Sequence, residues 1–86
     1  MALNPKAVAL TLGIFAAVVH LIFTIAIVVG GQSFLNWVAG IHMISGLTVA
    51  PFSAMNAVMG IVVPFILASI FGYILATIWN FVSEKV

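Results

Sequence analysis

The sequence predicts an all-α integral membrane protein: a two-helix transmembrane hairpin with an amphipathic interfacial helix in the connector. Three observations predict this fold class. Hydrophobic residues make up 66% of the 86 residues and charged residues only 3%, whereas a soluble domain carries about 25% charged residues. The charged side chains, Lys6, Glu84 and Lys85, all lie close to the chain ends. The two uncharged stretches between them are each long enough to cross a bilayer.

The first transmembrane helix is expected at about residues 5–29 of a single membrane domain, residues 1–86. Asn4 is a favourable N-cap, and Pro5 is tolerated at the first helical position because its missing N–H would be unpaired there. The helix would span about 37 Å, enough for a hydrocarbon core of about 30 Å with some tilt. Gly30-Gly31 is expected to end it. A cleaved signal peptide is disfavoured because the apolar run is longer than a typical signal-peptide core.

The connector is predicted to hold an amphipathic helix at about residues 33–45. Apolar residues recur there at i, i+3, i+7 and i+10, which is typical of a helix with one apolar face. Such a helix would lie at the membrane surface with a Trp at headgroup depth. A re-entrant segment covered by protein is the alternative. The apolar face holds Phe34, Trp37, Val38, Ile41 and Ile44, and the polar face holds Gln32, Ser33, Asn36 and Gly40.

The second transmembrane helix is expected at about residues 54–82, after a turn at residues 46–51. Ser53 is its expected N-cap, and Pro64 is expected to kink it. Trp79 near its far end is suited to the membrane interface.

The charge distribution predicts the orientation of the hairpin. Lys6 and Lys85 flank its two ends, whereas the connector holds no Lys or Arg. Because cytoplasmic segments carry the excess of positive charge, both termini are expected in the cytoplasm and the connector outside.

Small residues mark one face of each predicted span. In lipid, helices associate through close backbone contact at such residues rather than through the hydrophobic effect. The simplest arrangement therefore packs the two small faces against each other. The residues expected in this contact are Gly13, Ala17, Ala68, Gly72 and Ala76.

A polar stripe of Ser69, Tyr73, Thr77 and Asn80 runs beside the small face of the second helix. Polar groups facing acyl chains without a partner cost several kcal/mol. Ser69, Tyr73 and Asn80 are therefore expected to face another subunit or another protein. The alternative is internal: the hydroxyls bond their own backbone, Asn80 lies at the interface and Tyr73 reaches the first helix.

His20 lies deep in the first span, on its small face. An ionisable residue inside a membrane is a candidate functional site, and neutral imidazole can ligate a metal or the central metal of a porphyrin-type ring. Ala16, one turn earlier, leaves room for a flat ring, a spacing that resembles light-harvesting antenna helices. No cofactor is predicted, and haem, a chlorophyll-type pigment and copper are the alternatives. The alternative is a neutral His20 bonded to a carbonyl, Tyr or Thr within the bundle.

His42 and Met43 are the candidate metal ligands of the connector, because His and Met together can hold copper. Their spacing matches no established ligand pattern. His20 is expected at a different depth, and Met more often fills gaps in packing.

Enzyme chemistry is not expected. The chain has no Asp, Arg or Cys and only one Glu, so paired carboxylates, a Ser-His-acid triad and phosphate-binding loops are missing. A net charge of +1 is too small to indicate a nucleic-acid partner.

Two groups of residues carry a resemblance that covers most of the chain. They are Leu3-Asn4-Pro5-Lys6-Ala7-Val8-Ala9-Leu10 with Leu12-Gly13-Ile14 and His20-Leu21, and Phe71-Gly72-Tyr73-Ile74 with Trp79-Asn80. This pattern resembles a family of small prokaryotic two-helix membrane proteins of unknown function. The resemblance implies a two-span prokaryotic membrane protein and transfers no catalytic residue.

The sequence thus favours a structural role, as a homo-oligomer or an accessory subunit of a larger membrane complex that packs through its second helix. The alternative is a cofactor- or metal-binding subunit that uses His20, or His42 and Met43.

Overall fold

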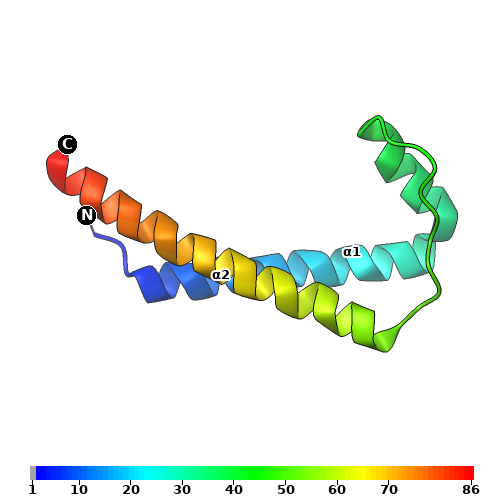
Figure 1. Cartoon of the computed structure of the whole chain (residues 1–86), viewed down its shortest axis with the longest axis horizontal. Coiled ribbons are helices and arrows are strands. Elements are labelled where there is room, and N and C mark those ends of the chain that lie inside the picture. The colour runs from blue at the N-terminus through cyan, green and yellow to red at the C-terminus, as the bar shows by residue number, and fades with distance from the viewer. Residues whose placement is uncertain (1) are drawn as a thin grey trace.

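The computed structural model describes residues 2–86 and contains two helices, α1 (Pro5–Ile41) and α2 (Ala54–Lys85). Residues 2–86 include no strand. Figure 1 shows the helices antiparallel and crossing, with both termini at one end of the hairpin and the connector at the other. Both helices are long and apolar enough to cross a membrane.

Helix α1 is bent at Gly31, which divides it into residues 5–30 and 32–41. Gly31 has φ 64° and ψ −150°, a conformation that is essentially restricted to glycine. Beyond it the chain turns away from the axis of the long part of α1 (Figure 1). This bend lies at the glycine pair where the sequence places the end of the first helix.

Gly30 is needed at the bend for a different reason. A Cβ atom at Gly30 would lie 2.5 Å from the Cβ of Phe34. The ring of Phe34 packs edge-on against Phe23 and lies beside Trp37, with ring centroids 6.0 and 6.2 Å away. Gly31 therefore supplies the backbone conformation of the bend, and Gly30 supplies the space for Phe34.

The helix after the bend ends at Ile41, four residues before the predicted end at residue 45. His42 caps it, and Met43 adopts a left-handed conformation with φ 61°. The Met43 and Ile44 amides donate to the carbonyls of Gly40 and Ala39, at 3.0 and 2.8 Å. Ile44, predicted on the apolar face of this helix, is thus already part of the non-helical connector.

Gln32 holds the connector against the short helix. Its Nε2 donates to the Leu47 carbonyl and to Asn36 Oδ1, both at 2.8 Å. Its Oε1 accepts from the Val49 amide at 3.0 Å. One side chain therefore fixes the connector backbone, which has no regular secondary structure of its own here.

The predicted N-caps are present at both helix starts. Asn4 Oδ1 accepts from the Lys6 and Ala7 amides, and Ser53 Oγ accepts from the Asn56 amide. Helix α2 continues through Pro64 and ends at Lys85, beyond the expected end at residue 82.

The core is a narrow strip where the two helices touch. Ala76 is buried in this strip and Ala39 is buried in the short helix after the bend, whereas large apolar side chains such as Phe15 and Phe71 are each 65% exposed. The outer surface of the described hairpin is therefore mostly apolar.

Candidate functional site

Two glycines bring the helices into close contact. A Cβ atom at Gly72 would lie 3.1 Å from the Cα of Ala9 and 3.0 Å from a methyl group of Leu12. A Cβ atom at Gly13 would lie 3.0 Å from the ring and the carbonyl oxygen of Phe65 and would overlap Ser69 Oγ. Real Cβ atoms do not fit at these distances without displacing a neighbour.

The structure places the predicted packing residues in or beside this contact. Gly13, Gly72 and Ala76 are buried, and Ala76 has no exposed surface. Ala17 and Ala68 are half-buried. The small faces of the two helices therefore do pack against each other.

Ser69 lies within the hairpin, not on its outer face. Its side chain lies against Gly13, and its hydroxyl is buried without a hydrogen-bond partner among residues 2–86. The position expected from the polar stripe was partner-facing. The sequence pattern shows which residues share a side of α2, but it does not show which side of α2 packs against α1.

Asn80 also bonds within the chain. Its Oδ1 accepts from the Leu3 amide at 2.7 Å, and its Nδ2 donates to the Leu3 carbonyl at 2.8 Å. This pair joins the N-terminal segment to the end of α2, so the Asn80 side-chain amide is occupied. Of the three residues predicted to face a partner, Tyr73 is the one that remains on the outer surface.

Tyr73 is 49% exposed on a helix whose outer face is otherwise rich in Ile, Leu and Phe. Its hydroxyl has no hydrogen bond among residues 2–86. Thr77, one turn later, donates its hydroxyl to the Tyr73 carbonyl at 2.9 Å. Thr77 is therefore satisfied by its own helix, whereas Tyr73 is not.

His20 is exposed and bonds to its own helix. Its Nδ1 lies 2.8 Å from the carbonyl oxygen of Ala16. Because a carbonyl only accepts, Nδ1 carries the hydrogen in this arrangement, and Nε2 keeps an unshared electron pair. Nε2 has no partner among the described residues. This is the tautomer in which a neutral His can accept a proton donor or ligate a metal.

His42 repeats the same local arrangement, with Nδ1 2.7 Å from the Val38 carbonyl oxygen. Met43 beside it is 97% exposed. Residues 2–86 hold no group of three or more His, Cys, Asp or Glu side chains close enough to share a metal ion. His42 and Met43 are thus two exposed neighbours at the end of the short helix.

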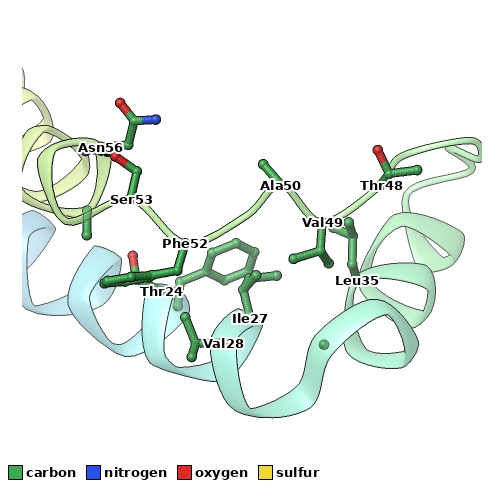
Figure 2. Close-up of a pocket in the computed structure, with 13 residues that line it drawn as sticks. Thr24, Ile27, Val28, Leu35, Thr48, Val49, Ala50, Phe52, Ser53 and Asn56 are labelled. Carbon is green, nitrogen blue, oxygen red and sulfur yellow. Dashed lines mark hydrogen bonds between the residues drawn. The ribbon is translucent and has the colours of Figure 1, made fainter.

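A pocket with a volume of about 470 Å³ lies at the connector end, lined by α1, the connector and the start of α2. Figure 2 shows the ring of Phe52 directed onto α1 beside Thr24, Ile27 and Val28. The polar ends of Thr48 and Asn56 lie on the opposite, outer rim. No charged side chain lines this pocket.

A second, smaller groove lies next to this pocket along the helices. Its volume is about 280 Å³, and it shares Thr24, Val28, Phe52 and Ala57 with the first pocket. From there it extends toward Leu21 and Ile61, and its exposed surface is wholly apolar.

The pocket, the Gln32 bridge and the Asn80–Leu3 pair were not predicted from the sequence. Only the polarity of Gln32 and Asn80 in an apolar chain gave a local signal, because the partners of both lie far along the sequence. Comparison with protein-family models, with curated proteins and with solved structures found no match. The resemblance to a two-helix family stays a prediction from the sequence.

Proposed function

We propose that this protein is a two-span prokaryotic membrane protein with a structural role, a homo-oligomer or an accessory subunit of a larger membrane complex. Two long apolar helices with mostly exposed apolar side chains support insertion into a bilayer. In water that surface would have to be covered, whereas acyl chains solvate it. The family resemblance noted in the sequence supports the same class.

The hairpin has its termini in the cytoplasm in this proposal. Lys6, Glu84 and Lys85 lie at the end of the hairpin that holds both termini. The connector at the other end has no Lys or Arg. The short helix 32–41 and the connector lie at the outer surface, where water and headgroups can bond the unpaired connector backbone.

Tyr73 carries the proposal that α2 meets another membrane helix. Its side chain is half exposed and lies well inside a span, and its hydroxyl has no partner among residues 2–86. Interhelical hydrogen bonds in membranes contribute about 0.6 kcal/mol on average and up to about 1.7 kcal/mol. A neighbouring helix, from a second copy or another subunit, would provide the acceptor or donor that lipid cannot.

Association is tested in detergent micelles and nanodiscs by native mass spectrometry, and by energy transfer between separately labelled copies. Tyr73→Phe removes only the hydroxyl and should weaken association about threefold to eighteenfold. Thr11→Val is the matched control, because the Thr11 hydroxyl donates to its own helix at Ala7. A strictly monomeric chain without co-purifying partners, or a Tyr73→Phe variant that associates like the parent, contradicts the proposal.

One observation favours a second candidate function, a cofactor-binding subunit. The bond from His20 Nδ1 to Ala16 orients the ring and leaves Nε2 available on an exposed face. His20 Nε2 would hold the central metal of a haem or chlorophyll-type ring, and Ala16 is the small residue one turn before it. The His42-Met43 pair would offer copper two ligands and need others from a partner.

Absorption spectra and metal analysis of the protein purified from its native membrane test this second function. A visible or near-infrared band that His20→Leu abolishes and His42→Leu preserves would establish His20 as the ligand. A colourless, metal-free protein ends this candidate and leaves the structural role in place.

A further inference from the structure

We propose that the pocket at the connector end binds an uncharged lipid with a carbonyl-bearing headgroup, such as an isoprenoid quinone or a diacylglycerol, and that the adjoining groove holds its hydrocarbon tail. The inference assumes only that the hairpin lies in a bilayer. It does not depend on association through Tyr73.

One hollow has polar groups at its rim and the other is wholly apolar, which suits a lipid with a polar headgroup and an apolar tail. The larger pocket, about 470 Å³, carries polar groups on its outer rim and apolar side chains against α1. The smaller groove, about 280 Å³, has no exposed polar surface and shares Thr24, Val28, Phe52 and Ala57 with the pocket. The two neighbouring hollows are therefore polar at the connector and apolar along the helices. Both volumes lie in or close to the range of small-ligand sites, about 300–1,000 Å³.

The depth of the site suits a lipid whose headgroup lies at the membrane interface and whose tail points toward the bilayer centre. Ile61, at the inner end of the groove, lies seven residues after the start of α2 at Ala54, or roughly 10 Å along the helix axis. Half of a hydrocarbon core is about 15 Å. The groove therefore runs from the interface toward the middle of the bilayer, along the direction of a lipid tail, and the tail can enter sideways from the membrane.

The rim selects an uncharged headgroup. Neither hollow is lined by a Lys, Arg, Asp or Glu residue, so a phosphate or carboxylate would find no countercharge here. The Asn56 amide and the Thr48 hydroxyl can both donate hydrogen bonds, and neither side chain has a partner among residues 2–86. Carbonyl oxygens are the acceptors that such donors would meet on a neutral lipid.

Binding is measured on the full chain in phospholipid nanodiscs with decylubiquinone, whose quinone ring quenches Trp fluorescence. Trp79→Phe leaves Trp37 as the reporter, and Trp37 contacts Phe34, whose other ring neighbour, Phe23, lines the pocket. Trp37→Phe leaves Trp79 near the opposite end of the hairpin. We expect saturable quenching of Trp37 and only linear quenching, from quinone dissolved in the bilayer, of Trp79. Equal, linear quenching of both overturns the proposal.

Substitutions at the junction and the rim test the location. Ala57→Phe should abolish saturable quenching because Ala57 lines both hollows. Ala54→Phe, one turn earlier on the same helix and outside both hollows, should preserve it. Asn56→Leu keeps the pocket filled to a similar extent and should weaken binding about fivefold, as expected for one lost hydrogen bond. Unchanged binding by Ala57→Phe and Asn56→Leu refutes this site.

Competition identifies the lipid. Displacement of decylubiquinone by dioleoylglycerol indicates that a neutral ester lipid shares the site, and a lack of displacement indicates a quinone; both support the inference. Displacement by oleate at the same concentration as dioleoylglycerol would show that headgroup charge is irrelevant and would overturn it.

Discussion

Gly72→Ala should loosen the hairpin, and the contacts around Gly72 set the size of the effect. The added Cβ would lie 3.1 Å from both the Cα of Ala9 and the carbonyl oxygen of Val8, and 3.0 Å from a methyl group of Leu12. Carbon atoms pack best at about 3.5–4.0 Å. Leu12 can rotate away, but the Ala9 and Val8 atoms are backbone. The helix axes must therefore separate by several tenths of an ångström.

Overpacking of this kind costs about 1–3 kcal/mol. Alanine also favours a helix over glycine by about 1 kcal/mol, so a control must remove that contribution. Gly60→Ala provides it, because a Cβ atom at Gly60 would meet nothing within 4 Å. Relative to Gly60→Ala, Gly72→Ala should shift the equilibrium toward separated helices by about fivefold to 150-fold.

Helix separation can be followed by energy transfer between two dyes in mixed micelles of increasing denaturing detergent. The chain has no cysteine. Labelling Ala2→Cys and Ser83→Cys therefore places one dye beside the start of α1 and one near the end of α2. The Gly72→Ala hairpin should open at a lower denaturing-detergent fraction than the Gly60→Ala hairpin. Equal midpoints would show that the two helices do not make the close contact at Gly72 on which this reasoning depends.

Three further predictions concern the bend, the connector and the orientation. Gly31→Ala should destabilise the bend by about 1–3 kcal/mol because φ 64° with ψ −150° is essentially a glycine conformation. The distance between spin labels at Ser33 and Ala57 should therefore change. Gly40→Ala is the control, and it should leave this distance unaltered because Gly40 is an open helical site. Gln32→Leu removes both bonds to the connector, so the Val49 amide should exchange its hydrogen about tenfold faster, while the capped Asn56 amide keeps its rate. In intact cells a membrane-impermeant maleimide should label Ser45→Cys but not Ser83→Cys, and the reverse pattern would invert the proposed topology.

The parts of the fold that follow from neighbouring residues were predictable. Asn4 and Ser53 act on amides two or three residues away, so the sequence contains all that is needed to locate both helix starts. The glycine pair at 30–31 likewise indicates a break. The end of the short helix was predicted too late because Met43 turns left-handed and the Ile44 amide bonds back to Ala39, and apolar periodicity carries no information about either.

The candidate site was less predictable because it depends on how the helices are rotated and where they diverge. The helical repeat places Ser69 and Tyr73 on the same side of α2. In the structure, however, Ser69 lies against Gly13 and Tyr73 is exposed on the outer surface. The same period groups His20 with Gly13 and Ala17. His20 is nevertheless exposed, because it lies on the connector side of the close contact.

The two halves of the hairpin therefore have different physical roles. Toward the termini, Gly13, Gly72 and Ala76 pack tightly, and Asn80 joins the two chain ends. Toward the connector, a Cβ atom at Gly60 would meet nothing within 4 Å, and the pocket lies between α1 and the segment of residues 48–57. Regions with few buried contacts open at low free-energy cost, whereas tightly packed regions open only with the whole structure. Substitutions in the terminal half should accordingly change whether the hairpin forms, and those around the pocket should change what it binds while the helices stay paired.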